Sequence, residues 1–433
     1  MPGDLITTNF LQSPQQRSRA SILAWIFLDW AASGFSTISI TLLVAYFNKI
    51  VFATGGWGVP GGVLWAWTLA ATMFLSAVVS PFLSAWVDRR HIHQRAVVLS
   101  SMLGATACIT LALLPAESQV GIIVSIVIAT VSFDMASIFT ASLLPKLAQG
   151  RAADTLSSIG FAAGYGGGAI ALILATSLIA ARESFGLTAA GALRGSFAIM
   201  GLWWLVFSLP TAFVRMTKAT STNHSGTSTK ELIQFLTTIF SKNQTGHTIP
   251  QLGWLMLGVV TVLGVVQTAI PQFSNVALET FELDPTQLVQ LVLLVQFIAL
   301  PGAILVGWLS GIWSRRAAAN ICLFGWSMVL ALAWAVSSVP QLYALAVLLA
   351  LVLGGIQSVL RAMLAVAAPS GHHAATFGIM QVGTKLTGFF ASLIFGWTYM
   401  ASGMPKAGLV ILLVQLMFGW WLLSRAQNED AEF

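Results

Sequence analysis

The sequence predicts an all-α membrane protein with twelve transmembrane helices, arranged as two bundles of six. Three observations predict this fold class. Of the 433 residues, 57% are hydrophobic and only 8% are charged, whereas a soluble domain carries about 25% charged residues. The apolar residues form twelve runs, each long enough to cross the roughly 30 Å of hydrocarbon in a bilayer. One long polar segment, residues 215–249, separates these runs into two sets of six.

The twelve runs define the expected elements in order. A helix rises about 1.5 Å per residue, so about 20 apolar residues span the lipid bilayer that this chain requires as its solvent. We expect an N-terminal tail (1–20), an N-terminal bundle (21–214), a C-terminal bundle (250–425) and a second tail (426–433). The expected spans cover 21–47, 59–85, 95–114, 119–143, 157–181, 192–214, 250–275, 286–312, 317–336, 340–366, 373–400 and 405–425. The segment 215–249 begins with a Ser, Thr and Gly-rich stretch, which is typical of a linker.

The distribution of Lys and Arg predicts the orientation in the membrane. If the N-terminus is cytoplasmic, the loops on the inner side carry most of these residues, and only Lys49, Arg182, Arg194 and Lys406 fall outside. The positive-inside rule therefore predicts a multi-pass protein of the cell (inner) membrane with both termini in the cytoplasm. The net charge is +6, and the Lys and Arg residues that produce it lie mostly between apolar spans. Contacts with lipid headgroups explain such charges, so nucleic acid is not an expected partner. The inner residues are Arg17, Arg19, Arg89, Arg90, Arg95, Lys146, Arg151, Arg215, Lys218, Lys230, Lys242, Arg315, Arg316 and Arg425.

The two halves repeat a short motif after their second spans. Residues 85–90 read AWVDRR and residues 311–316 read GIWSRR, an offset of 226 residues. Two six-helix halves related by an internal repeat are the expected build of an alternating-access transporter. The residues of these turns are therefore candidates for a cytoplasmic gate loop, namely Asp88, Arg89, Arg90, Arg315 and Arg316.

The layout and several motifs resemble the major facilitator superfamily, and within it the vacuole effluxer-like branch. The resembling stretches are 29–33 (DWAAS), 157–168 (SSIGFAAGYGGG), Arg194 with 203–210, and Gly354–Arg361 followed by Pro369, Phe377–Gly378 and Lys385. Yeast members of this branch are vacuolar amino-acid effluxers, so the resemblance implies transport of a small polar solute such as an amino acid. Ala32, Ala141 and Leu360 replace hydrogen-bonding residues of the branch pattern, and the solute is therefore not carried over.

Four ionisable residues fall within spans: Asp29, Asp134, Arg361 and Lys385. Charges in hydrocarbon are costly, so each is a candidate for function. The resemblance implies that spans one, four and ten, which carry the first three, line a central cavity. Asp134 and Arg361 are 227 residues apart, close to the repeat offset, and we predict that they are pseudo-symmetric partners that form, with Asp29, an inner gate or a proton-sensitive site. The alternative is a set of permanent structural ion pairs, with Lys385 bound to one carboxylate.

Neutral residues add a softer prediction. Gln357 precedes Arg361 by four residues, which places both on one helical face, and Gln267 lies in span seven. Such amides either bind a polar solute or hold helices together. In span five, small residues recur every four positions at Gly160, Gly164 and Gly168; this stripe predicts close packing against another span.

The remaining expectations concern what the chain lacks. Cys108 and Cys322 lie in apolar runs, which predicts core residues and no disulfide. We find no set of residues typical of an enzyme, no metal ligand set and no cofactor motif. Because a nucleotide-binding motif is also missing, we expect a proton gradient to drive transport. The protein is expected to be a monomer. A metal or siderophore transporter is the first alternative. A non-transporting scaffold or sensor is the second, although its usual soluble domain is missing from this sequence.

Overall fold

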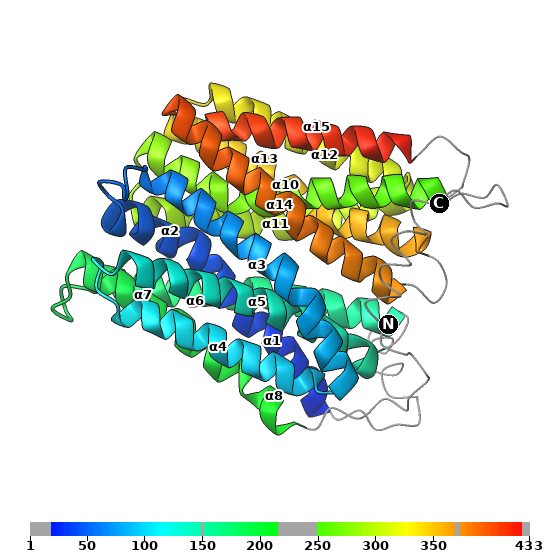
Figure 1. The fold of residues 1–433 in the computed structure, drawn as a ribbon, viewed down its shortest axis with the longest axis horizontal. Coiled ribbons are helices and arrows are strands. Elements are labelled where there is room, and N and C mark those ends of the chain that lie inside the picture. The colour runs from blue at the N-terminus through cyan, green and yellow to red at the C-terminus, as the bar shows by residue number, and fades with distance from the viewer. Residues whose placement is uncertain (1–18, 149–150, 215–248, 369–372, 427–433) are drawn as a thin grey trace, which may run out of the picture.

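The structure is a computed structural model that describes residues 19–148, 151–214, 249–368 and 373–426. Within this part, twelve helices are long and apolar enough to cross a membrane, as the sequence predicts. They run roughly side by side and form one elongated body (Figure 1). Most of the expected linker and tails lie outside the described residues.

The N-terminal half begins with a helix that changes its winding. Helix α1 (Arg19–Ile38) continues through a π-helical segment η1 (Ser39–Leu43), a short α2 (Val44–Tyr46) and a second π-helical segment η2 (Phe47–Val51). π-Helical segments are rare and often occur at functional sites. The other helices of this half are α3 (Gly61–Arg90), α4 (His93–Leu113), α5 (Gln119–Leu147), α6 (Arg151–Ala180), α7 (Ala189–Ser208) and α8 (Pro210–Phe213).

The C-terminal half contains six long helices, and local sequence explains several of their ends. Asp284 accepts a hydrogen bond from the Gln287 backbone and caps α11, while Ser314 accepts one from the Ala317 backbone and caps α12; both satisfy amides that a helix start leaves unpaired. The helices are α10 (Ile249–Phe281), α11 (Pro285–Ile312), α12 (Arg315–Ala335), α13 (Val339–Ala367), α14 (His373–Ser402) and α15 (Ala407–Arg425).

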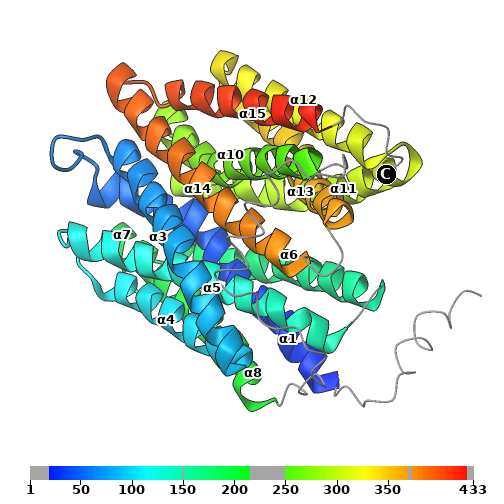
Figure 2. The ribbon, with the colours of Figure 1, turned by 45° about the vertical axis from the view of Figure 1, so that its right-hand side comes forward.

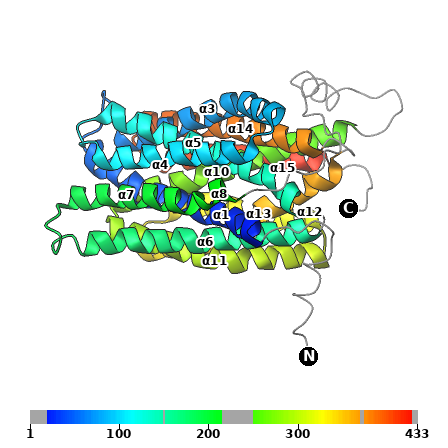
Figure 3. The same ribbon diagram turned by 90° about the horizontal axis from the view of Figure 1, so that it is seen from below.

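The helix ends define two faces of the molecule. We call the face that carries Arg19 and Arg425 the near face, and the opposite one, which carries Val51 and Phe281, the far face; they lie to the right and left of Figure 1. Helix α3 packs along α14, and α6 packs against α11 (Figures 2 and 3). On the far side, the end of the first helix of each half also meets the other half, because η1 and α2 contact α10.

Helix bounds correct the predicted repeat register. The ends of α13 follow those of α5 by 220 residues, so an offset of 227 does not relate Asp134 to Arg361. Asp134 lies thirteen residues before the end of α5, whereas Arg361 lies six before the end of α13. The two side chains therefore start about 10 Å apart in depth. Shorter connections in the C-terminal half shift the register between the two halves. Matching residues in one turn do not reveal this shift.

The basic turns show a smaller shift in the same direction. Arg89 and Arg90 are the last residues of α3, whereas Arg315 and Arg316 are the first residues of α12. Both pairs lie on the near face, in the turn between the second and third spans of their halves. The echo in the sequence therefore marks corresponding turns but not corresponding residues.

Candidate functional site

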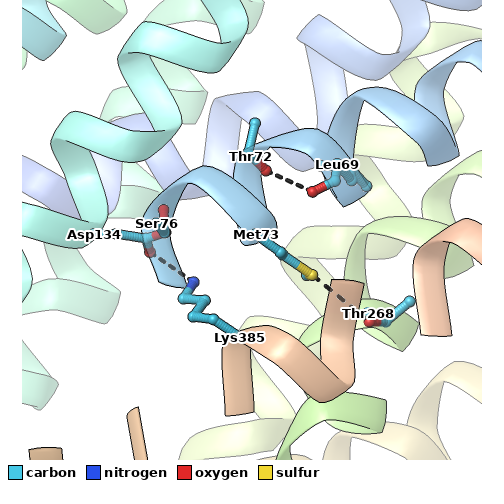
Figure 4. A network of polar contacts seen from close by, with 7 residues as sticks. All are labelled: Leu69, Thr72, Met73, Ser76, Asp134, Thr268 and Lys385. Carbon is cyan, nitrogen blue, oxygen red and sulfur yellow. Dashed lines mark hydrogen bonds and ion pairs between the residues drawn. The ribbon is translucent and has the colours of Figure 1, made fainter. Parts of the chain in front are cut away.

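The two halves are joined at mid-depth by an ion pair. Lys385 Nζ on α14 donates to Asp134 Oδ1 on α5 at 2.7 Å, and Ser76 Oγ on α3 donates to Asp134 Oδ2 at 2.6 Å (Figure 4). The Asp134 and Lys385 side chains are only 10% and 17% exposed. Lys385 starts twelve residues from the near end of α14 and Asp134 thirteen from that of α5, so both lie about 18–20 Å deep. We call these three residues the charged link.

The charged link satisfies costly groups with one another. A buried ion needs an opposite charge and further hydrogen bonds to offset its lost hydration. Both oxygens of Asp134 have a partner, one from each half of the molecule. Of the two sequence-based interpretations, the structure shows the pairing given by the alternative, a carboxylate with Lys385. Its role in transport is a separate question.

Close helix packing brings the charged link together. Near Ser76 on the same helix, the Met73 sulfur lies against α10 and α14, and Thr268 Oγ1 is 4.0 Å from that sulfur and donates to the Gly388 carbonyl at 3.3 Å (Figure 4). A Cβ atom on Gly388 would lie 2.8 Å from the same sulfur. The glycine therefore leaves room for the Met73 side chain where α3 and α14 pack beside the charged link.

Asp29 lies apart from the charged link, at the contact of α1 with α6. The position of a Cβ atom on Gly160 is 2.7 Å from Asp29 Oδ2, so the missing side chain makes room for this carboxylate. Among the described residues, no hydrogen bond or ion pair engages the Asp29 side chain. An unpaired carboxylate within a membrane-spanning helix is costly, which makes it available to a ligand or a proton.

The glycine stripe of α6 faces polar residues of α1 along two turns. A Cβ atom on Gly164 would lie 2.7 Å from Ser33 Oγ, and one on Gly168 would meet the Thr37 hydroxyl. Asp29, Ser33 and Thr37 are themselves spaced by four residues. The small residues therefore let the polar side of α1 lie directly on α6, which is the packing that the stripe predicts.

Of the four charges predicted within spans, Arg361 is the second, after Asp29, whose side chain has no partner among the described residues. In the part of the chain that the structure describes, its side chain makes no hydrogen bond or ion pair, and its Nε atom is buried. The expected contact with Asp134 does not form in this structure: Asp134 accepts from Lys385 and Ser76, and Arg361 starts about 10 Å nearer the near face. Gln357 precedes Arg361 by one helical turn, and Gln267 lies on α10; the described residues offer neither side chain a hydrogen bond.

A second polar contact between the halves lies near the far face. Asn48 Nδ2 on η2 donates to Asn275 Oδ1 on α10 at 2.7 Å, and Asn275 Nδ2 donates to the Gly62 carbonyl at 3.0 Å and to Gln272 Oε1 at 2.9 Å. The two asparagines are 3% and 0% exposed. We call Asn48, Asn275 and the Gly62 carbonyl the amide latch.

The near-face turn after α3 is held by contacts within the N-terminal half. His93 Nε2 is 3.5 Å from Asp88 Oδ1, Arg89 Nε donates to the Ala85 carbonyl at 3.1 Å, and the Arg90 guanidinium lies 5.5 Å from the centre of the Trp86 ring. These contacts order the turn. A gate role for it, together with Arg315 and Arg316 in the C-terminal half, stays a prediction.

Comparison with known proteins identifies the family. The family model described as vacuole effluxer Atg22 like matches residues 64–432. The chain belongs to this family. The "Uncharacterized MFS-type transporter YxiO" of Bacillus subtilis (strain 168) is 22% identical over 418 residues, covering 94% of this chain and 95% of the relative.

Solved structures show the same fold. A D-xylose-proton symporter has a TM-score of 0.67 at 15% identity, covering 95% of this chain and 99% of its own. The nucleoside transporter NupG has a TM-score of 0.63 at 14% identity, covering 94% and 98%. This Atg22-like chain is therefore a multi-pass protein with the major facilitator fold, and both the predicted fold class and the predicted resemblance are confirmed. Among the described residues, no group of three or more His, Cys, Asp or Glu side chains could hold a metal ion.

Sequence analysis missed two residues that join the structure together. Ser76 gives no signal, because a serine in a transmembrane helix usually bonds its own backbone. Asn48 lies at the predicted end of span one, where an asparagine is typical of a loop. Only helix packing brings each of them to a partner on another helix.

Proposed function

We propose that this Atg22-like chain is a secondary active transporter that moves a small polar solute, an amino acid or similar metabolite, by alternating access with coupling to protons. The observation that carries this proposal is the charged link, which joins the two halves through Asp134 and Lys385 at mid-depth. A contact that must break when the halves move can transmit a change in charge into a change in conformation.

Protonation of Asp134 would supply that change. The attraction between the two halves at this point is that of the Lys385 ammonium for the Asp134 carboxylate, whose atoms are 2.7 Å apart. A proton on Asp134 removes the attraction and leaves only neutral hydrogen bonding across the halves. Because a proton then has different affinities for the joined and separated states, it shifts the population between them. A proton gradient can thereby drive the movement of the halves.

Two charges of opposite sign, which have no partner in the described part of the chain, are available to the solute. Asp29 belongs to the N-terminal half, and Arg361 belongs to the C-terminal half with Gln357 one turn away. Ionic groups without partners are destabilising inside a membrane, and a solute that carries an amine and a carboxylate offsets both. Gln267 on α10 offers a further amide. This chemistry agrees with the amino-acid class that the family resemblance implies.

The orientation follows from the positive-inside rule. The inner loops expected from the sequence correspond to the near face, where α3 ends at Arg89 and Arg90 and α12 begins at Arg315 and Arg316. We assign the near face to the cytoplasm of a cell membrane and the far face to the outside.

A flux measurement tests the proposal. The purified protein is reconstituted into liposomes, a pH gradient is imposed, and uptake of each of the twenty radiolabelled amino acids is measured. We expect accumulation of a subset that collapses with a protonophore. Asp134→Asn should reduce the pH-driven component at least tenfold, since the amide cannot release a proton. Glu183→Gln is the matched control, because this loop carboxylate is 89% exposed, and it should transport normally.

Three outcomes would contradict the proposal. Gradient-dependent uptake that survives in Asp134→Asn would exclude coupling through Asp134. Uptake of ferric siderophores or metal salts in the same vesicles, with none of any amino acid, would support the metal or siderophore alternative. Failure to move any of these solutes, with correctly folded protein, would favour a scaffold or sensor.

A further inference from the structure

The amide latch lies where the two halves touch through corresponding elements. Asn48 belongs to the far end of the first span of the N-terminal half, and Asn275 to the far end of the first span of the C-terminal half. The halves of this fold are parallel repeats related by an axis along the membrane normal. An element can touch its own counterpart only close to that axis. The Asn48–Asn275 hydrogen bond of 2.7 Å therefore marks the axis near the far face.

This position is also that of the solute path. In an alternating-access transporter built from two repeats, the solute site lies at the interface of the repeats, around the same axis. A fully buried contact across the axis leaves no room for a solute to pass. Because the latch lies between the mid-depth residues and the far face, it blocks the path from mid-depth to the far face.

Further hydrogen bonds extend the closure on both sides of the latch. Gln272, which accepts from Asn275, donates to Ser392 Oγ at 3.4 Å, and Ser392 donates to the Ala66 carbonyl at 2.8 Å. In another direction, Gln296 Nε2 on α11 donates to Thr37 Oγ1 on α1 at 3.0 Å. Each chain of contacts crosses from the C-terminal to the N-terminal half.

We propose that Asn48 and Asn275 form the gate that closes the solute path at the far face through a hydrogen bond between two neutral side chains. The inference rests on alternating access in the proposed function, but not on the identity of the solute or on Asp134. The gate opens when the halves separate at the far face. Each of the two amide side chains then hydrogen-bonds to water in place of the other.

Two features make this contact reversible. Asn48 Oδ1 is buried and has no hydrogen-bond partner, so the closed state carries an unsatisfied acceptor that becomes hydrated on opening. Asn48 also lies within a π-helical segment, and a second one precedes it at Ser39–Leu43. Changes between π-helical and α-helical winding can move a helix end without unfolding it, in keeping with the frequent occurrence of such segments at functional sites.

Gly62 fixes how closely the two halves approach at the latch. A Cβ atom on Gly62 would lie 3.0 Å from Asn275 Oδ1 and 2.8 Å from the Tyr399 ring. An alanine there would displace Asn275 while both asparagines remain. Gly62→Ala thus disturbs the gate by geometry, and Asn48→Ala disturbs it by chemistry.

A spectroscopic distance measurement tests the gate without any solute. The buried Cys108 and Cys322 are replaced by alanine, and spin labels are attached at Glu117→Cys and Ser337→Cys, one on a far-face loop of each half. Pulsed electron–electron double resonance then gives the distribution of distances between the two labels across the far face. We expect Asn48→Ala to raise the ratio of open to closed molecules by about tenfold, the effect of one lost buried hydrogen bond. Gly62→Ala should raise it in the same direction, and keeps the test valid if Asn48→Ala does not fold.

The control variant removes an asparagine that bonds within one half. Asn320 Oδ1 accepts from Trp420 Nε1 at 3.0 Å, and both residues belong to the C-terminal half. Asn320→Ala should leave the far-face distances unchanged. Wild-type distances in both Asn48→Ala and Gly62→Ala, with folded protein, would overturn the gate. This result does not depend on whether the flux measurement succeeds.

Discussion

Two of the polar contacts that join the halves, the charged link and the amide latch, differ in charge. The charged link at mid-depth consists of an ion pair between Asp134 and Lys385, while the amide latch near the far face consists of two neutral side chains, Asn48 and Asn275. Both are largely buried, and both must break when the halves separate at their level. Only the charged link can change its state by taking up a proton. The difference teaches that a contact able to take up a proton and a contact unable to do so join the halves at different depths, which matches the separate roles proposed for them in coupling and closure.

The largest expected effect concerns the charged link and stability. Lys385→Met leaves Asp134 as an unpaired buried carboxylate, and breaking such a pair costs about 3–5 kcal/mol. The double variant Asp134→Asn/Lys385→Met should recover most of that loss, because it leaves no lone charge. Unfolding of the four proteins in detergent, analysed as a double-mutant cycle, measures the coupling. Equal destabilisation in the single and double variants would mean that the ion pair contributes nothing beyond packing.

A smaller effect is expected where neither contact is touched. Gly168→Ala places a methyl group against the Thr37 hydroxyl and 3.1 Å from the Ser33 carbonyl oxygen, and overpacking of this kind costs about 1–3 kcal/mol. Gly378→Ala is the matched control in α14, since nothing lies within 4 Å of its Cβ position. Thermal unfolding of both variants measures the difference. If Gly168→Ala were as stable as Gly378→Ala, the packing of α1 on α6 would be looser than the structure shows.

The next effect separates the serine from the ion pair. Ser76→Ala removes one hydrogen bond to Asp134 and leaves Lys385 in place, which should cost about 1.5 kcal/mol. Unfolding in detergent measures the loss. Thr72→Val is the control one turn away, since its hydroxyl bonds the Leu69 carbonyl of its own helix, and it should cost less than Ser76→Ala. Equal costs in the two variants would mean that the Ser76 bond to Asp134 adds nothing to stability.

The smallest effect is expected at the near-face turn. Asp88 and His93 lie 3.5 Å apart, with the Asp88 side chain 44% exposed, and solvent-exposed pairs contribute about 0–1 kcal/mol. Asp88→Asn should therefore change the free energy of unfolding by less than about 0.5 kcal/mol. A clear loss of flux at unchanged stability would support the predicted gate loop. Unchanged flux would limit this turn to a structural role.

The spans and the charged residues could be predicted because they follow from local composition. A run of twenty apolar residues has few alternatives to a membrane helix, so all twelve spans were found, and Asp134 and Lys385 stood out as ionised groups in hydrocarbon. The glycine stripe at Gly160, Gly164 and Gly168 likewise predicted a close helix contact. The partner of each group could not be predicted, since residues 134 and 385 are 251 positions apart and belong to different halves.

The repeat register shows the limit most clearly. Equal spacing of Asp134 and Arg361 with the turn motifs indicated an equivalence that the helix ends do not support. Loop lengths change the register between halves without changing the helices, and a sequence read without its fold gives no account of depth. Asn48 was missed for a related reason, since its π-helical segment extends the first helix beyond the expected residue 47.

The sequence by itself determined that this chain crosses a membrane twelve times, which side of its helices is crowded with small residues, and which four charges must be accommodated in the hydrocarbon. These properties depend on residue type and on spacing along one helix. The tertiary structure alone decided that Lys385 rather than Arg361 pairs with Asp134 and that two asparagines meet across the halves. It also decided that Asp29 and Arg361 find no partner among the residues that the structure describes. Contacts between distant helices depend on packing, depth and rotation, and no short stretch of sequence encodes these quantities.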